Sequence, residues 1–227
     1  MKPSVVAIDG PAASGKSTLG YRLAQKWGYL FFDTGVLYRV VSLAALEHGV
    51  SIDDEVGLTE LAETIHSDVR PPTADDGRFN TVLLDGRDVT WAIRTPAVDA
   101  IVSPVSAVPG VRHALRDTQR RVGQRGCVIV IGRDIGTVVM PDADLKLFIE
   151  ASLEMRARRR FDEVTRRGEK VSFEHVLEEM RRRDERDRNK PISPLVAAPD
   201  AIVLDTTELD VDSVVSKVEE LIASGDF

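Results

Sequence analysis

The chain has 227 residues, of which 43% are hydrophobic, and its formal net charge is −7. This length and apolar content allow one substantial buried core with small mobile elements, so we expect a single main domain. The negative charge argues against a protein that binds nucleic acid or acidic membranes nonspecifically.

The apolar runs of the chain argue against membrane insertion and export. The longest run, Cys127–Ile131, is far too short to span a bilayer, and the first residues lead directly into a strand-like segment. We therefore expect a cytoplasmic protein. Its single cysteine, Cys127, lies inside that apolar run and is expected to be buried in the core.

Short apolar segments alternate with longer helical patterns along most of the chain, which predicts an α/β fold with a parallel sheet. The expected strands are mostly apolar on both faces, as in a sheet that helices cover on both sides. They are Ser4–Ile8, Leu30–Phe32, Cys127–Ile131, Leu145–Ile149 and Ala201–Leu204. Apolar residues at helical spacing predict helices at Lys16–Trp27, before Gly28, and at Phe173–Arg188, before Pro191.

This alternation is lost between about residues 51 and 100, where the composition becomes acidic and Pro71-Pro72 interrupts the chain. Within this region, Arg78–Val89 holds two strand-like pieces around Asp85-Gly86, a dipeptide that is typical of tight turns. We therefore expect a small antiparallel insertion. Trp91, just beyond it, is expected to be a packing residue.

Residues 10–17 match the P-loop pattern G-x-x-x-x-G-K-[ST] between an expected strand and an expected helix. The glycines let the backbone turn tightly, so that amide N–H groups and the helix N-terminus can hold phosphate oxygens. Lys16 is expected to reach the β- and γ-phosphates, and Ser17 to offer its hydroxyl to Mg²⁺. The residues expected to bind ATP are Gly10, Pro11, Ala12, Ala13, Ser14, Gly15, Lys16, Ser17 and Thr18.

A P-loop does not by itself identify the phosphate acceptor. GTP-specific switch proteins usually carry an N-K-x-D element, whereas the one Asn-Lys pair here is followed by Pro191-Ile192. Transfer to a small substrate needs a second anion site opposite the P-loop. Two polar loops, Asp33–Arg39 and Gly132–Thr137, follow expected parallel strands, so we expect them at the same carboxyl edge of the sheet as the P-loop.

The segment from Glu150 to Lys190 is rich in arginine, interleaved with almost as many carboxylates. Most of these arginines are expected to form surface ion pairs on a helical hairpin. A few are expected to act from a closing lid, where they would stabilise the transferred phosphate and exclude water. Arg156, Arg159 and Arg160 follow the fourth strand directly and are the lid candidates.

Several stretches together resemble the bacterial cytidylate kinase family, and the resemblance spans essentially the whole chain. They are the P-loop, Phe32–Arg39, Gly132–Ala143 and Arg183–Asn189. The Gly-Arg-Asp-Ile-Gly-Thr sequence with its Pro-Asp-Ala tail is the most specific of them. Asp85–Val89 with Ile93-Arg94 resembles the insertion of that family, and Ser103–Arg112 resembles the segment that follows it.

The resemblance implies the P-loop nucleoside monophosphate kinase fold, an α/β fold in which helices flank a five-stranded parallel sheet, with a small NMP-binding insertion and an arginine-rich lid. It implies one kinase domain over residues 1–227: a core at 1–35, 100–150 and 190–227, an NMP-binding region at about 36–99 and a lid at about 151–172. It further implies ATP-dependent phosphorylation of CMP and dCMP with Mg²⁺ and release of ADP. The implied protein is a monomer without nucleic-acid or membrane partners.

The resemblance also implies roles for particular residues. The phosphate of CMP would be held by Arg39, Arg133 and Lys190, cytosine would be read by Thr34, Ser103, Arg112 and Asp134, and the sugar would be contacted by Arg183 and Asp187. The implied catalytic residues are Lys16, Arg133, Arg156, Arg159 and Arg160.

One of these assignments has a plain chemical basis, and another departs from the family pattern. The carboxylate of Asp134 can accept a hydrogen bond from the exocyclic amine of cytosine but would repel the carbonyl oxygen that uracil presents there, so it would select CMP over UMP. Lys190 stands where members of the family often have arginine, and lysine lacks the planar bidentate fork of a guanidinium.

Two other classes of protein stay open. A kinase for UMP, AMP or shikimate would keep the ATP site and differ in the acceptor. A noncatalytic nucleotide-dependent module would use the arginine-rich helices to contact RNA, but the charge between Glu150 and Lys190 is about balanced and aromatic residues there are sparse.

Overall fold

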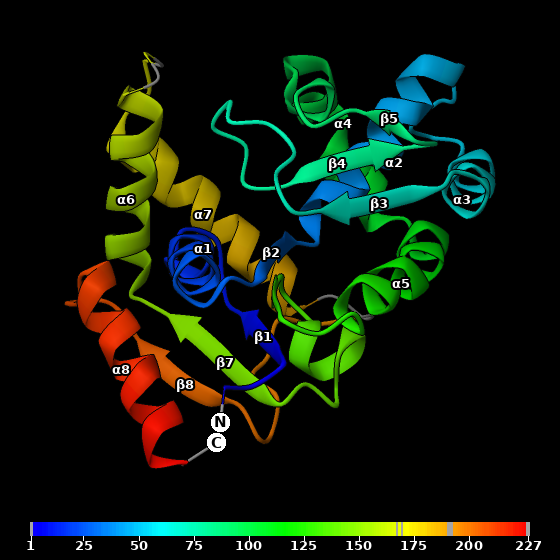
Figure 1. Ribbon diagram of the computed structural model, residues 1–227. Coiled ribbons are helices and arrows are strands. Elements are labelled where there is room, and N and C mark those ends of the chain that lie inside the picture. Colours follow the sequence, from blue (N-terminus) through cyan, green and yellow to red (C-terminus); the bar gives the residue numbers. More distant parts are fainter. Residues whose placement is uncertain (1, 167, 169, 190–192, 226–227) are drawn as a thin grey trace. The chain divides into compact units, whose positions relative to one another are not determined.

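The computed structural model describes residues 2–166, 168, 170–189 and 193–225. The chain divides into two compact units. We call Met1–Trp27 with Ile129–Phe227 the P-loop unit, and Gly28–Val128 the middle unit. Elements of both units are labelled in Figure 1.

The larger sheet has five strands in the order β2-β6-β1-β7-β8. Their bounds are β1 Val5–Asp9, β2 Leu30–Asp33, β6 Val128–Ile131, β7 Leu145–Glu150 and β8 Ile202–Asp205. β1 pairs in parallel with β7, with Asp9 opposite Phe148, and β7 pairs in parallel with β8, with Glu150 opposite Asp205. The predicted five-stranded parallel sheet is therefore confirmed, with strand ends that differ by a residue from the prediction.

The expectation that every strand is covered on both faces was wrong for β8. This strand lies at the edge of the sheet, and its residues alternate between half-buried and exposed, with Val203 50% exposed. The expectation of a buried cysteine was also wrong. Cys127 precedes β6 instead of opening it, has a φ of 47°, and is exposed, because the turn that leads into the strand directs its side chain outward.

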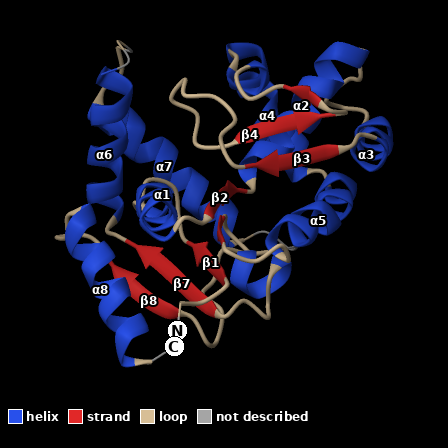
Figure 2. Cartoon of the chain, in the orientation of Figure 1, coloured by secondary structure: helices blue, strands red, loops and turns tan. Residues whose placement is uncertain are grey.

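The helices of the P-loop unit are α1 Lys16–Trp27, α6 Leu153–Arg166, α7 Phe173–Arg188 and α8 Val211–Ser224, with a short π-helical turn, η2, at Ile135–Val139. The predicted bounds of α1 and α7 are confirmed. α6 and α7 pack against each other as a hairpin (Figures 1 and 2). The apolar core of this hairpin includes Ala157, Val164, Val176 and Met180, and the P-loop residues Ala12 and Ala13 pack on it.

The middle unit combines helices with a small antiparallel sheet in the order β3-β4-β5. Its elements are α2 Gly35–His48, α3 Glu55–Thr64, β3 Ser67–Arg70, β4 Thr81–Leu84, β5 Arg87–Asp88, η1 Ala92–Arg94, α4 Pro96–Ala107 and α5 Pro109–Gly123. The predicted antiparallel pair around Asp85-Gly86 is confirmed: both residues have positive φ, 49° and 81°, which a tight hairpin turn requires. Strand β3 was not predicted; it runs opposite to β4 (Figure 2).

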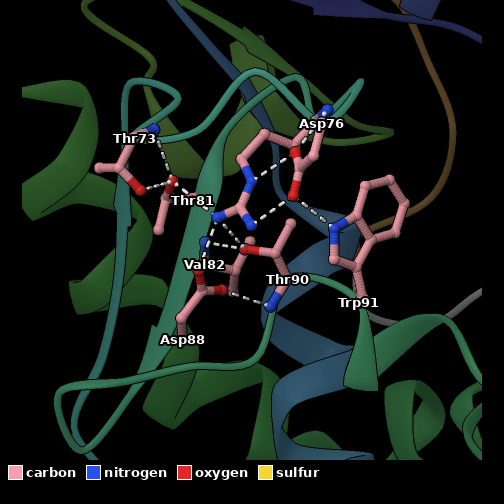
Figure 3. A network of polar contacts seen from close by, with 8 residues as sticks. Thr73, Asp76, Thr81, Val82, Asp88, Thr90 and Trp91 are labelled. Carbon is pink, nitrogen blue, oxygen red and sulfur yellow. Dashed lines mark hydrogen bonds and ion pairs between the residues drawn. The ribbon is translucent and has the colours of Figure 1, made fainter.

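Arg78 organises the loop between β3 and β4, and its partners Asp76 and Asp88 are labelled in Figure 3. Its side chain is 7% exposed and donates hydrogen bonds to Asp76 (Nη2–Oδ2, 2.7 Å) and Asp88 (Nη1–Oδ2, 2.6 Å). These bonds from Arg78 hold the pKa of Asp76 well below its usual range and lower that of Asp88 to about 2. The loop is therefore tied to the edge of the small sheet through one guanidinium.

Trp91 takes part in this network and is not a packing residue, so that prediction was wrong. The residue is 49% exposed, and its Nε1–H donates to Asp76 Oδ2 over 2.9 Å. Arg94 lies over the same ring, 5.9 Å from its centroid.

Replacing Arg78 tests this network. Arg78→Met should lower the free energy of unfolding at neutral pH because Asp76 and Asp88 lose their common donor. The pKa of each carboxyl is depressed in the folded state, so the stability that the network contributes is present above the ordinary value near 3.8 and is lost as the pH falls from about 4 toward 2. Urea denaturation at pH 7, 4 and 3 should therefore show a smaller acid-induced loss in the variant than in the wild type.

Arg87→Met is the matched control, since Arg87 forms an exposed pair with Glu47 (2.6 Å). Equal destabilisation by the two substitutions would contradict a special role for Arg78.

Candidate active site around the P-loop

The P-loop connects β1 to α1, and geometry requires both of its glycines. Gly10 has a φ of 150°, and a Cβ atom there would lie 2.1 Å from the carbonyl oxygen of Ile149 in β7. Gly15 has a φ of 95°, a backbone angle that residues other than glycine rarely adopt. The loop therefore lies against the backbone of the neighbouring strand, where no side chain fits.

Several polar groups of the loop have the character of an anion site. Lys16 Nζ donates to the carbonyl oxygen of Pro11 over 2.9 Å, so the lysine folds back over the loop. Ser17 and Thr18 are exposed at the start of α1. The hydroxyl oxygen of Ser14 is buried and has no hydrogen-bond partner among the described residues. A buried hydroxyl without a partner is costly unless a ligand or water satisfies it.

A cavity of about 240 Å³ lies beside the loop. Its walls combine Ser14 and Thr18 with apolar side chains of α1, β7 and α8, including Leu19, Ile149 and Val214. Thr206 closes one side, where its hydroxyl donates to the carbonyl oxygen of Ser14 over 2.9 Å. No motif in the sequence indicates the β8–α8 side of this cavity.

The three lid candidates have different surroundings. Arg156 is 3% exposed, and its Nη1 and Nη2 bind both carboxylate oxygens of Asp184 over 3.1 and 2.6 Å. It also donates to the carbonyl oxygens of Ala151 (2.9 Å) and Ala12 (3.4 Å). Arg156 therefore ties together α6, α7 and the P-loop.

Arg159 and Arg160 are less enclosed. Arg159 lines the cavity and donates from Nη2 to the carbonyl oxygen of Thr206 over 2.6 Å; burial lowers its pKa. Arg160 pairs with Glu163 over 2.9 Å. The pKa of Arg183 is lowered, first by loss of solvent and then by the charge of Arg160. Two guanidinium groups close enough to repel each other favour an anion between them.

The loop after β6 carries Arg133 and Asp134 and is held at both ends. Gly132 N–H donates to the carbonyl oxygen of Ile8 over 3.0 Å. At the other end, the N–H groups of Ile135 and Gly136 donate to Asp9, over 2.8 and 2.7 Å. Arg133 forms an ion pair with Asp187 of α7.

Asp9 is the buried carboxyl group at the end of β1, 4% exposed. Burial raises its pKa to about 6, while the N–H donors of Gly136 and Ile135 act in the opposite direction. Asp9 has no predicted role, because in the sequence an aspartate at the end of a strand cannot be told from the first residue of a loop.

The predicted substrate residues of the middle unit lie on α2, α4 and α5, helices that pack on one another. Thr34 is buried just before α2. Arg39 of α2 donates to Asp99 Oδ1 over 2.6 Å and to the carbonyl oxygen of Ile93 over 3.0 Å. Ser103 is exposed on α4, and Arg112 of α5 lies over the ring of Tyr38, 5.6 Å from its centroid.

Arg94 is a further cation near Arg39, and the sequence did not predict a role for it. Its pKa is lowered, first by loss of solvent and then by the charge of Arg39, and Asp33 and Asp99 act in the opposite direction. Arg39 and Arg94 therefore form a second place where two guanidinium groups lie near each other. The signal in the sequence was the Ile93-Arg94 pair inside the segment that resembles the family's insertion.

The remaining substrate residues belong to the P-loop unit or lie outside the described residues. Arg133, Asp134, Arg183 and Asp187 are in the P-loop unit. Lys190 lies outside the described residues. The action of all these residues on one substrate stays a prediction. Across the described part of the chain, no helix combines the length and apolar character needed to cross a membrane.

The matching family profile and two similar curated proteins are all described as cytidylate kinase. The sequence profile described as cytidylate kinase matches residues 6–224. A cytidylate kinase from Herpetosiphon aurantiacus is 49% identical over 204 residues, which cover 90% of this chain and 87% of that protein. A cytidylate kinase from Chloroflexus aggregans is 50% identical over 202 residues, covering 89% of this chain and 86% of that protein. The crystal structure of an uncharacterized protein from Eubacterium ventriosum shares the fold, with a TM-score of 0.55 at 16% identity over 98% of this chain and 99% of that chain.

The buried pair of Arg156 and Asp184 gives a stability prediction. Asp184→Asn should lower the free energy of unfolding by about 3–5 kcal/mol, because a buried guanidinium loses its charge partner. Urea denaturation followed by circular dichroism measures this change. The matched control on the same helix is Glu178→Gln, which breaks exposed pairs with Arg181 and Arg182 and should cost less than about 1 kcal/mol. A loss below about 1 kcal/mol in Asp184→Asn as well would show that the pair does not hold the hairpin to the P-loop.

Proposed function

Because the chain belongs to the cytidylate kinase family, we propose that it transfers the γ-phosphate of ATP to CMP, and to dCMP, with release of ADP. Family membership establishes the coarser statement, that the protein is a kinase that phosphorylates nucleoside monophosphates with ATP. The choice of cytosine is supported by one observation above all. Arg133 and Asp134 are adjacent in a loop held at both ends, so a phosphate-binding cation and an amine-binding carboxylate are presented together.

The ATP phosphates are proposed to lie in the P-loop, at Gly10–Thr18. The buried Ser14 hydroxyl, which has no hydrogen-bond partner within the described part of the chain, and the exposed start of α1 support this placement, since both favour a bound anion. The neighbouring cavity is proposed to take the adenine ring, because its walls are mostly apolar and Arg159 provides a cation to stack on the ring.

The residues present fit a bound Mg²⁺ that is held largely by ATP and water. The hydroxyl of Ser17 is exposed next to Lys16, and the described residues contain no group of three or more His, Cys, Asp or Glu side chains arranged to hold a metal. Mg²⁺ commonly keeps several waters and binds one or two protein oxygens plus substrate phosphates. When bound, it would neutralise charge on the β- and γ-phosphates.

The acceptor is proposed to be held through its phosphate and its base. Arg39 and Arg133 would bind the phosphate, with Lys190 assisting. Arg94 joins this proposal because its charge already interacts with that of Arg39. The base would be read by Thr34, Ser103, Arg112 and Asp134. Arg183 and Asp187 would contact the sugar.

The reaction needs no protein nucleophile. The attacking atom is an oxygen of the CMP phosphate, which is mostly deprotonated at neutral pH because the second pKa of a phosphate monoester is about 6. Lys16, Arg133, Arg159 and Arg160 would stabilise the charge of the transferred group. Arg156 is proposed to contribute by holding the lid hairpin against the P-loop, since its guanidinium is engaged by Asp184 and Ala12.

The guanidinium of Arg133 is paired with the carboxylate of Asp187. A substrate phosphate would compete with this carboxylate for Arg133. A phosphate that binds Arg133 would weaken this pair and leave the Asp187 carboxylate to accept a hydrogen bond from a sugar hydroxyl. The two proposed contacts, phosphate to Arg133 and sugar to Asp187, would therefore form together.

The P-loop assignment is tested by removing its lysine. Lys16→Ala should lower kcat with ATP and CMP by on the order of 10²–10³-fold, because a cation next to the transferred phosphate is lost. Coupled ADP-release assays measure the rate, and CMP binding by calorimetry should be retained. Lys26, at the exposed end of the same helix, pairs with the surface residue Glu219. The control variant Lys26→Ala should therefore keep wild-type turnover. Wild-type turnover in Lys16→Ala would show that the P-loop does not serve the reaction.

The acceptor is tested with a panel of CMP, dCMP, UMP and AMP. We expect the highest kcat/KM with CMP or dCMP. In Asp134→Asn, the ratio of kcat/KM for CMP to that for UMP should fall by at least about tenfold, because the amide can donate to the carbonyl oxygen of uracil. Glu178→Gln, which alters an exposed carboxylate of α7 that pairs with Arg181 and Arg182, is the control. A preference of the wild type for UMP or AMP would exclude cytosine as the preferred base.

A further inference from the structure

We propose that Asp9 is a positioning residue that fixes the loop carrying Arg133 and Asp134, and thereby sets the discrimination between CMP and UMP. This inference rests on the proposed function, since it concerns how that same site is held in place. Asp9 does not touch the reacting groups in the proposed mechanism; it acts through the backbone of the loop.

Both carboxylate oxygens of Asp9 bind the backbone of the loop. One carboxylate oxygen, Oδ1, accepts from Ile135 N–H (2.8 Å), and the other, Oδ2, accepts from Gly136 N–H (2.7 Å). The opposite end of the loop is bound to the preceding residue of β1, through the bond from Gly132 N–H to Ile8 O (3.0 Å). Arg133 and Asp134 are the two residues between these anchors.

Glycine suits position 136 because the surrounding atoms leave little room for a side chain there. A Cβ atom at that position would lie 3.3 Å from Cδ of Lys146 and 3.5 Å from Oδ2 of Asp9. The backbone of the loop can therefore approach the carboxylate closely. Only an ionised carboxylate presents two acceptor oxygens to two N–H donors; asparagine presents one acceptor and places a second donor against an N–H.

Asp9 is also the residue directly before the P-loop. The strand end that bears this anchor continues into Gly10, whose own position is fixed by its close approach to Ile149. The ATP-binding loop and the loop proposed to bind CMP thus have a common attachment at the end of β1. A shift of about 1 Å in either loop is enough to reduce the rate of a two-substrate reaction substantially.

The charges around Asp9 make its effect dependent on pH. Asp134, in the loop after β6, and Lys16, at the start of α1, act on it electrostatically in opposite directions. Lys146 of β7 lies along the loop at Gly136, with its ammonium group bound to Asp200 over 2.6 Å. Burial raises the pKa of Asp9 to about 6. Below that pH the carboxyl gains a proton and one of the two N–H acceptors is lost.

The central experiment measures kcat/KM for CMP and UMP in Asp9→Asn. We expect the CMP-to-UMP ratio to fall by about tenfold or more, with the KM for CMP raised and the KM for ATP changed less than about threefold. The matched control is Asp144→Asn at the opposite end of β1, where Asp144 accepts the N–H of Val5 over 2.8 Å. Asp144 performs the same kind of side-chain-to-backbone bond away from the loop, so its substitution should leave the ratio unchanged.

A double variant separates positioning from a general loss of structure. If Asp9 acts through Asp134, then Asp9→Asn combined with Asp134→Asn should discriminate no worse than Asp134→Asn alone. Additive losses would overturn the proposal. An unchanged CMP-to-UMP ratio in folded Asp9→Asn would also overturn it, while a changed ratio in Asp134→Asn would leave the proposed function intact. No change in Asp134→Asn would instead contradict the proposed base reading itself.

The wild-type enzyme provides a test that does not depend on folding of the variant. The phosphates of CMP and UMP titrate alike, so their effect cancels in the ratio of kcat/KM for the two substrates. This ratio should fall as the pH decreases from 7.5 to 5.5, through the pKa of Asp9 at about 6. A ratio that stays constant over this range would overturn the proposal; in folded Asp9→Asn it should be constant.

Discussion

The groups of this kinase that would meet phosphate have to be held in position before any phosphate arrives, and buried aspartates do this. Asp9 binds the backbone of the loop after β6, and Asp184 and Asp187, one turn apart on α7, bind Arg156 and Arg133. A guanidinium in a partly buried place is costly without a counter-charge. The aspartates supply that charge. Asp187 thereby leaves Arg133 preorganised for an anion, while Asp184 fixes Arg156 between the hairpin and the P-loop.

The two units differ in how exposed the carboxylates are that pair with these arginines. In the P-loop unit the anchoring carboxylates are buried, so a change in any of them disturbs packing as well as charge. In the middle unit Arg39 pairs with Asp99, whose side chain is 55% exposed, and Arg94 lies on the exposed ring of Trp91. Exposed pairs are weak and exchange easily. The cations of the middle unit are therefore better suited to release a carboxylate in favour of a phosphate.

Much of the fold followed from local patterns in the sequence. The P-loop, the two amphipathic helices α1 and α7, and the hairpin at Asp85-Gly86 depend on residues close together in the chain, and the structure has each of them. Strand β3 was missed because it is short and three of the four residues of its sequence, Ser67–Arg70, are polar. Cys127 was misplaced because an apolar run does not reveal where a turn ends and a strand begins.

The site was predictable where a motif is contiguous and not where it depends on contacts between distant segments. Asp9 acts on residues more than a hundred positions away, and Thr206 reaches Ser14 across the sheet. Nothing near either residue in the sequence signals its partner. Arg94 was visible within a resembling segment, but its nearness to Arg39 arises from the packing of η1 and α4 on α2.

The exposure of Cys127 has a practical consequence. It is the one cysteine of the chain, and its thiol lies at the surface where β6 begins. A maleimide fluorophore would therefore attach at a single defined position without any engineered cysteine. Because β6 joins Cys127 at its first end to the loop of Arg133 and Asp134 at its other end, such a dye would report on movements of that strand in an otherwise unaltered enzyme.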